Sequence, residues 1–424
     1  MRNTASFTVT NTLQFKQQML GWANRFNICC FLDSHDYHDI YQSYNCLVGV
    51  GAATIFNPQD DFLKHLKAFT QQHDDWLFGH ISYEANSTLA SQNSFADHLQ
   101  FPEIFLFQPQ IVVELISNTA TIHTLAESAE NVFAAIKNFS HRAAVSATEI
   151  HIQHRVSKED YLETVEELRQ QILRGNCYEI NFCQEFFAEN VALDPLYVYQ
   201  QLLQFSPTPF AAFYKIYDKY VCCASPERYL KKTGSTIISQ PIKGTIKRDH
   251  KNGVNDEALK QQLQHSKKDQ SENVMVVDLV RNDLSKICVE GSVHVKELFG
   301  VYTFPTVHQM ISTIAGELKA NVDVAEVLNA TFPMGSMTGA PKKKVMELIH
   351  KFEVSKRGIY SGSIGYITPQ KNFDFNVVIR SIMYNETNKY LSYQVGSGIT
   401  FNSIAEQEYE ECLLKAEAIK KALR

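Results

Sequence analysis

The sequence predicts an α+β protein built on antiparallel β-sheets with helices around them. Short segments rich in β-branched and aromatic residues recur along the chain, and many of them come in pairs rather than in strict alternation with helices. The chain has 424 residues, of which 44% are hydrophobic and 20% charged. At roughly 150 residues per domain, this length corresponds to just under three domains, and the composition is that of a folded chain with a large core.

The first portion of the chain consists mainly of short predicted strands. These segments carry the β-branched and aromatic residues and are bounded by turn residues: 26–34, 44–52, 76–84, 101–116 and 119–125. Residues 60–72 have apolar side chains at helical spacing. A polar, alanine-rich stretch at 126–148 predicts a boundary, so we divide the chain into residues 1–150 and 151–424 and expect the two portions to form one compact unit.

The second portion opens with a predicted helix. Ser157 is a suitable N-cap with Asp160 three residues later, and apolar residues then follow on one helix face up to Gly175. Further helices are predicted at 195–205, 256–284, 323–331, 341–353 and 405–423. Strands are predicted at 177–188, 210–217, 219–224, 236–239, 293–303, 309–317, 359–368, 373–384 and 390–400.

Composition excludes several functional classes. Forty Lys and Arg against 46 Asp and Glu give a net charge of −6, which argues against a nucleic-acid partner. No apolar run approaches the roughly 18 residues of a membrane helix, and the N-terminus lacks the pattern of a secretory signal. We therefore expect a soluble, cytoplasmic protein. The nine cysteines show no CxxC spacing, so we expect reduced, buried thiols rather than a zinc site.

Acidic residues occur at helical spacing in two distant segments. Asp269 and Glu272 lie one turn apart, and Glu408, Glu411 and Lys415 follow the spacing i, i+3 and i+7. Brought together, the two acidic pairs would form an oxygen-rich site for a hard divalent ion such as Mg²⁺. The alternative is an ordinary surface ion pair between Glu411 and Lys415.

Two glycine-containing segments are candidate anion sites. In the segment 333–352, Pro341 suits the first helical position and Thr338 or Gly339 suits the cap, which would leave free N–H groups for an anion. The glycines of Gly396-Ser397-Gly398 could let a ligand carboxylate approach the backbone closely. A plain tight turn is the alternative for both segments.

Lys243 and Glu227 each follow a predicted strand and are ambiguous when taken alone, because most lysines and glutamates are solvated. The motifs that contain these two residues indicate a functional role. Seven segments match one family in order and spacing from about residue 150 to the C-terminus: SPERY (225–229), PIKGT (241–245), ENVMVVDLVRNDL (272–284), PMGSMTGAPK (333–342), RGIYSGSIGY (357–366), DFNVVIRS (374–381) and VGSGI (395–399) with EQEYEECLLKA (406–416).

With these motifs the chain resembles the chorismate-utilising enzymes, which include component I of anthranilate synthase and of aminodeoxychorismate synthase. The resemblance implies antiparallel sheets packed as a sandwich with surrounding helices. Anthranilate synthases carry alanine between Pro-Ile and Gly-Thr, whereas aminodeoxychorismate synthases carry lysine, and this chain has Lys243. The resemblance therefore implies that chorismate and ammonia give 4-amino-4-deoxychorismate, the precursor of 4-aminobenzoate and folate.

In the implied mechanism, Lys243 attacks C2 of chorismate, Glu227 protonates the departing C4 hydroxyl, and ammonia enters at C4 and expels the lysine. The lysine must be neutral to attack, so we expect burial or a neighbouring cation to lower its pKa. The resemblance implies that Glu272 and Glu411 bind Mg²⁺, with Asp269 and Glu408 acting through water. It implies a further set of residues that grip the substrate: Thr338, Tyr360, Arg380, Lys415 and the backbone of Gly396, Ser397 and Gly398.

Other implications concern regulation, partners and departures from the family. FLDS (31–34) matches a tryptophan pocket, which Ser34 would line. No amidotransferase nucleophile is recognisable, so ammonia should come from a separate glutamine amidotransferase subunit, and pyruvate elimination from a separate lyase. Gln309 stands where the family has the histidine of anthranilate formation, and Glu179 replaces a usual glutamine. Isochorismate-forming members carry a water-activating lysine at position 179, so hydrolytic chemistry is disfavoured.

Two alternatives remain at this point. The first is anthranilate synthase component I, which would use the same fold and metal but aminate a different carbon. The second is a catalytically inactive chorismate-binding subunit, which the intact set of charged motif residues disfavours.

Overall fold

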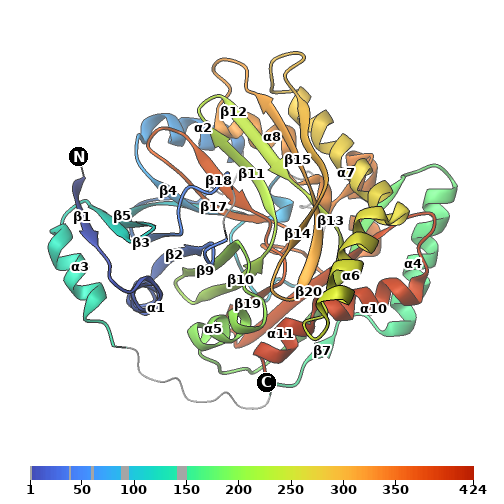
Figure 1. The fold of residues 1–424 in the computed structure, drawn as a ribbon, viewed down its shortest axis with the longest axis horizontal. Coiled ribbons are helices and arrows are strands. Elements are labelled where there is room, and N and C mark those ends of the chain that lie inside the picture. The colour runs from blue at the N-terminus through green and yellow to red at the C-terminus, as the bar shows by residue number, and fades with distance from the viewer. Residues whose placement is uncertain (1, 38–39, 59–61, 87–94, 141–149) are drawn as a thin grey trace.

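The computed structural model describes residues 2–37, 40–58, 62–86, 95–140 and 150–424 (Figure 1). Its strands form one antiparallel network of two arms that share the long strand β5 (Ile104–Ile116). Around β5, one arm runs in the order β1 (Asn3–Thr8), β6 (Thr119–Thr124), β5, β3 (Cys46–Phe56), β2 (Ile28–Asp33), β9 (Phe210–Ile216), β10 (Lys219–Ser225), β19 (Ser381–Asn385), β20 (Tyr390–Ile399) and β8 (Glu179–Ala188), with β7 (Gln153–His154) and β16 (Gly339–Ala340) on β8.

The other arm leaves β5 through β4 (Leu77–Ile81). It continues through β17 (Ser363–Ile367), β18 (Phe373–Asn376), β11 (Arg228–Thr233), β12 (Thr236–Gln240) and β15 (Val307–Glu317), which also pairs with β13 (Ile242–Lys247) and β14 (His294–Thr303). The helices are α1 (Thr12–Ala23), α2 (Phe62–Gln72), α3 (Ala129–Lys137), α4 (Lys158–Leu173), α5 (Pro195–Phe205), α6 (Gly253–His265), α7 (Lys267–Ser285), α8 (Val324–Thr331), α9 (Lys342–Phe352), α10 (Ala405–Lys415) and α11 (Glu417–Ala422). The expected α+β class with antiparallel pairing is confirmed.

Inner strands of the first arm, such as β2 and β10, are buried on both faces. In β2, Cys29 and Phe31 enter a core shared with α1, α4 and α10, whereas Ile28 and Cys30 enter a second core shared with β4, β17 and β11. This division follows from the alternation of side chains along a strand. It also explains the adjacent cysteines, since Cys222 and Cys223 on β10 enter different cores in the same way. All nine cysteines are buried and unbridged.

Several predicted elements differ from those observed. The predicted helix 256–284 is two helices, because the Ser266 hydroxyl accepts a hydrogen bond from the Asp269 N–H and starts α7 anew. The predicted helix 405–423 likewise breaks between α10 and α11. Helices α1 and α3 were not predicted, and the predicted strand 373–384 is interrupted between β18 and β19. Among the described helices, none is long and apolar enough to cross a membrane.

The two predicted portions contribute neighbouring strands to the same network. Strand β2 pairs with β9, and β4 pairs with β17, so main-chain hydrogen bonds join residues 1–150 to residues 151–424. Part of the proposed boundary, residues 141–149, lies outside the described residues. The boundary therefore stays a prediction. Of the remaining elements, α7 packs on β13 and β15 while α10 packs on β20 (Figure 1), which brings two distant segments to one place.

Candidate active site

A cavity of about 550 Å³ lies where β13, β20, α7 and α10 meet. Its volume is in the range of roughly 300–1,000 Å³ that small-molecule sites occupy. Most of the residues singled out in the sequence line it, although they come from segments far apart in the chain: Glu227, Lys243, Asp269, Glu272, Tyr360, Arg380, Gly396, Gly398, Glu411 and Lys415. The structure therefore assembles three of the four predicted acidic residues and the cationic residues around one space, whereas Glu408 does not line it.

Lys243, on β13, forms a buried ion pair with Glu179, the first residue of β8. The lysine side chain is 10% exposed and the glutamate side chain 2%. Burial alone would lower the pKa of Lys243, but the carboxylates of Glu179 and Glu272 more than offset burial and raise this pKa above its ordinary value. The expectation of a lowered lysine pKa is therefore wrong. An amine with a raised pKa is protonated near neutral pH, so it must give its proton to an acceptor before it can act as a nucleophile.

Glu227 and Arg380 are buried and oppositely charged groups of the cavity wall. Burial raises the pKa of Glu227 to about 7, although the nearby Ser336 hydroxyl and the Lys243 ammonium oppose the rise. Burial lowers the pKa of Arg380 to about 10, and the Glu227 carboxylate partly restores it. Among the described residues, no hydrogen bond or ion pair engages the Arg380 guanidinium. The site thus offers a proton donor near neutral pH and a planar cation suited to a ligand carboxylate.

The predicted metal residues surround one ammonium group. Lys268 on α7 lies 3.9 Å from Glu272 Oε1 and 3.5 Å from Glu408 Oε1. Burial opposes charge on Lys268, but four carboxylates raise its pKa, namely those of Glu408, Glu272, Glu411 and Asp269. The structure therefore brings all four acids within electrostatic reach of one cation. Burial raises the pKa of Glu272 to about 7 against the pull of Lys243 and Lys268.

The donor chemistry of this acidic group fits Mg²⁺. Glu272 Oε1 and Glu408 Oε1 are buried without a hydrogen-bond partner in the described structure. Within the same residues, no three acidic, histidine or cysteine side chains converge closely enough to enclose a metal ion by themselves. Mg²⁺ does not need such an enclosure, because it usually keeps several waters and binds through one or two carboxylates plus its substrate.

Lys415 and Glu411 form the i, i+4 ion pair that was the alternative to a functional role. Lys415 Nζ lies 2.7 Å from Glu411 Oε1 and donates to the Gly396 carbonyl at 2.8 Å. The Lys415 ammonium lowers the pKa of Glu411, although burial opposes this. Both residues line the cavity. Through Lys415 the backbone of Gly396 is connected to the acidic residue Glu411.

Thr338, a predicted substrate-binding residue, does not line the cavity, and neither does the side chain of Ser397, for which a backbone contact was predicted. Ser397 alternates with Gly396 and Gly398 on β20, so its hydroxyl points into the core and lies 3.1 Å from the Tyr161 hydroxyl. Thr338 is fully buried, and its hydroxyl donates to the Met334 carbonyl at 3.1 Å. Side-chain contact of either residue with a ligand in this cavity is not supported.

The expected anion seat at the start of α9 also differs from the structure. Pro341 is the cap residue itself rather than the first helical residue, and no side chain caps the helix. Thr338 and Gly339 therefore do not cap α9. Gly339 instead adopts a φ of 141°, and a Cβ there would lie 2.1 Å from the Glu179 carbonyl. This glycine allows the backbone that precedes α9 to pack against the start of β8.

Sequence reasoning missed two residues of the site, Lys268 and Ser336. Lys268 is four residues before Glu272, so helical spacing alone could have revealed it. Ser336 lies in the cavity wall, and its position relative to Glu227 depends on long-range packing. Gln309 was noted as a departure and does line the cavity, whereas the adjacent His308 pairs with Asp256 at 3.1 Å.

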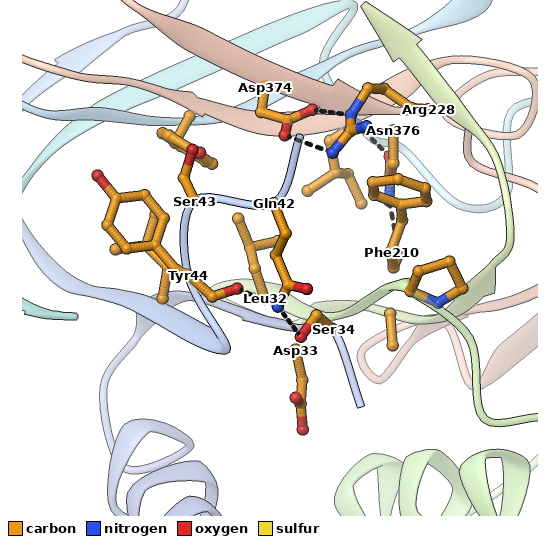
Figure 2. A pocket seen from close by; sticks show the side chains of 15 residues that line it. Leu32, Asp33, Ser34, Gln42, Ser43, Tyr44, Phe210, Arg228, Asp374 and Asn376 are labelled. Carbon is orange, nitrogen blue, oxygen red and sulfur yellow. Dashed lines mark hydrogen bonds and ion pairs between the residues drawn. The ribbon is translucent and has the colours of Figure 1, made fainter. Parts of the chain in front are cut away.

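Ser34 lines a second, smaller cavity, shown in Figure 2, of about 70 Å³. The Gln42 side chain extends across it and donates to Ser34 Oγ and, at 2.8 Å, to the Tyr44 carbonyl. On the opposite wall Arg228 and Asp374 form a two-point ion pair. A dry cavity of about 150 Å³ is large enough for benzene, so an indole could enter here only after Gln42 moved. Tryptophan binding therefore stays a prediction.

The site is a charged cavity suited to a small polyanionic ligand, and comparison with known proteins identifies its class. The sequence model of the chorismate binding enzymes matches residues 28–421. The chain belongs to this family. Its fold agrees with that of the menaquinone-specific isochorismate synthase of Escherichia coli, with a TM-score of 0.81 and 18% identity over 100% of this chain and 94% of that one.

Proteins whose sequences are more similar to this chain than that of the isochorismate synthase have different names. A probable aminodeoxychorismate synthase of rice, Oryza sativa subsp. japonica, is 42% identical over 62% of this chain and 29% of its own length. Aminodeoxychorismate synthase component 1 of Escherichia coli is 37% identical over 64% of this chain and 59% of its own. An anthranilate synthase component I-like protein of Synechocystis is 30% identical over 87% of this chain and 76% of its own. The chain thus spans less than a third of the rice relative and about three fifths of the Escherichia coli one.

Proposed function

We propose that this chain aminates chorismate at C4 with ammonia, giving 4-amino-4-deoxychorismate for 4-aminobenzoate synthesis. The observation that carries the proposal is the amine of Lys243 in the cavity wall, at the position where anthranilate synthases carry alanine. The names of the rice and Escherichia coli relatives support the same choice. A cytoplasmic location is part of this proposal.

In the proposed reaction, Lys243 Nζ attacks C2 of chorismate. The two ring double bonds each shift by one position, and the C4 hydroxyl leaves as water with a proton from Glu227. Ammonia then adds at C4, the double bonds shift back, and the lysine leaves C2. Covalent catalysis divides one difficult substitution into two easier steps. A pKa of about 7 suits Glu227 to its part, because a general acid works best when its pKa is near the working pH.

Cationic groups and backbone orient the substrate in this scheme. Chorismate carries two carboxylates, and the unpaired Arg380 guanidinium can bind one of them through two parallel hydrogen bonds. Lys415, Tyr360 and the backbone at Gly396 and Gly398 line the rest of the cavity. Gly398 has the further role of leaving space for the lysine, since a Cβ at this position would lie 2.9 Å from Lys243 Nζ.

Mg²⁺ is the proposed cofactor, held directly by Glu272 and Glu411 and through water by Asp269 and Glu408. When bound, the ion would neutralise the ring carboxylate at C1. The proposal is supported by the buried oxygens of Glu272 and Glu408, which accept no hydrogen bond in the described structure, and by the preference of Mg²⁺ for carboxylate and water ligands.

A glutamine amidotransferase subunit is the proposed source of ammonia, and a separate lyase would remove pyruvate from the product. The designation of the Escherichia coli relative as component 1 agrees with a second component. The alternative function, anthranilate synthesis, is favoured by the name of the Synechocystis relative. An inactive chorismate-binding subunit is the third candidate, and the complete set of charged groups in the cavity argues against it.

One incubation tests these alternatives. The purified chain is mixed with chorismate, Mg²⁺ and an ammonium salt, and the product is identified by mass and fluorescence. We expect aminodeoxychorismate from ammonium and none when glutamine replaces it. Protein quenched during turnover should carry a chorismate-derived mass on the peptide that contains Lys243. Fluorescent anthranilate as the product would refute the proposed function, and the absence of any adduct would refute the covalent route.

A further inference from the structure

We propose that Glu179 is the base that accepts the proton of Lys243 and so frees the lysine for attack. This inference rests on the proposed function, because it assigns a role in the first step of that reaction. The inference starts from one contact in the structure. The Glu179 carboxylate accepts a hydrogen bond from Lys243 Nζ, the atom that would form the bond to the substrate.

The pair is largely buried, and Glu179 is the more deeply buried member. Among the described residues, Lys243 is the only group that hydrogen-bonds to the Glu179 carboxylate. Glu179 does not line the cavity, so its carboxylate reaches the lysine from behind the cavity wall. With side-chain exposures of 2% and 10%, neither member is well placed to exchange a proton with bulk water. A proton leaving Lys243 is therefore best accepted inside the pair.

Two strands that neighbour β8, β16 and β20, shape the surroundings of this contact. Ala340 of β16 pairs with Glu179 on β8, and Gly339 lets that backbone approach closely. A Cβ at position 398, on the neighbouring strand β20, would lie 3.0 Å from Glu179 Oε1 and 2.9 Å from Lys243 Nζ. The absence of a side chain at Gly398 thus leaves room for the glutamate and the lysine to meet.

Other acids near the lysine have different tasks. The other charged groups that act on Lys243 come from three further places in the fold: Glu227 before β11, Glu272 on α7, and Glu411 and Lys415 on α10. Glu227 must hold a proton to release the C4 hydroxyl, so it cannot also take one in the same step. Glu272 and Glu411 are committed to the proposed metal, and Lys415 is a cation. Glu179 is the remaining carboxylate.

The proton balance closes over one turnover. One proton moves from Lys243 Nζ to Glu179, the freed electron pair forms the bond to C2, and Glu227 gives its proton to the departing hydroxyl. Ammonia then adds at C4 and the C2–N bond breaks. Lys243 recovers its proton from Glu179, and Glu227 takes one from the new C4 ammonium. The sum is chorismate plus ammonia giving aminodeoxychorismate plus water, with both residues restored.

The two roles open to Glu179, proton acceptor and plain ion-pair partner, predict opposite effects of Glu179→Gln. If Glu179 accepts the proton, the transfer takes place inside the pair and needs no exchange with solvent, so the wild-type kcat/KM stays level from pH 5.5 to 7 at saturating Mg²⁺ and a constant concentration of free ammonia. If it only holds a charged lysine, that lysine must lose its proton to solvent, and the wild-type kcat/KM rises tenfold per pH unit over the same range. Removing the carboxylate would then make attack easier.

The experiment measures kcat/KM for chorismate in aminodeoxychorismate formation at pH 5.5–9, with the concentration of free ammonia held constant, for wild type, Glu179→Gln and Glu179→Asp. We expect Glu179→Gln to lose about 10²-fold at pH 6, the usual contribution of a general base, and to acquire a rate that rises with pH. Glu179→Asp, which keeps a carboxylate, should recover part of the loss. Glu185→Gln is the matched control, because it removes another buried carboxylate of β8, one that pairs with Arg155 away from the cavity.

The outcomes separate the inference from the function on which it rests. A Glu179→Gln variant that folds, as judged by its melting temperature, and is faster than wild type at pH 6 would overturn the role of Glu179 alone. Equal effects of Glu179→Gln and Glu185→Gln would also overturn it. If wild type forms no aminodeoxychorismate at any pH, the proposed function fails first, and the assignment of Glu179 fails with it.

Discussion

Gly398→Ala is a sharp test of the geometry around Lys243. The φ angle of Gly398 lies outside the left-handed region, so alanine can adopt the backbone without strain. Its methyl group would be placed 2.9 Å from Lys243 Nζ and 3.0 Å from Glu179 Oε1, and ordinary contacts begin near 3.4 Å. The ends of these two side chains must therefore retreat by about half an ångström. A misplacement of 1 Å can cost about 10²-fold in rate, so we expect kcat/KM to fall about 10-fold or more.

Stability should change much less than activity in this variant. The loss from crowding flexible side-chain ends is opposed by the lower chain entropy of alanine in the unfolded state, so the free energy of unfolding should fall by at most about 2 kcal/mol. Gly253→Ala is the matched control, because no atom lies within 4 Å of the position that its methyl group would take at the start of α6. Ammonium-dependent kinetics and thermal melting measure both quantities. Wild-type kcat/KM in a folded Gly398→Ala protein would refute the argument.

Four further predictions concern single groups. Lys243→Ala should still bind chorismate but lose C4 amination by several orders of magnitude, as product mass would reveal, because the nucleophile itself is gone. Glu272→Gln and Glu411→Gln should each abolish Mg²⁺-dependent turnover and weaken Mg²⁺ binding measured by calorimetry, with the melting temperature preserved. Because Glu227 must be protonated and its pKa is about 7, kcat/KM at a constant concentration of free ammonia should fall as pH rises above 7, and an activity that instead increases to pH 9 under this condition would contradict its role as the acid. Gln42→Ala should enlarge the cavity at Ser34, so that tryptophan raises the melting temperature of the variant more than that of wild type.

The secondary structure was predictable where local signals are strong. Ser157 caps α4 as expected, because a hydroxyl that accepts a hydrogen bond from the third helical N–H is a local interaction. The division of residues 256–284 into two helices was missed although Ser266 is also a local cap, since continuous helical spacing on both sides concealed it. Strand β16, only two residues long, depends on pairing with distant β8 and has no local signal.

By itself, the sequence determined the family, and most of the site residues that it singled out line the cavity. Motif residues such as Lys243, Glu272 and Arg380 are recognisable because their chemical type and order along the chain carry the information. Tertiary structure alone decided which groups touch. The pairing of Lys243 with Glu179 joins residues 64 positions apart, and it changes the expected direction of the lysine pKa. The direction of Ser397 and the position of Gln42 across the second cavity were also decided by packing. Burial and the distance between charges set pKa values and contacts, and both depend on segments that only the folded chain brings together.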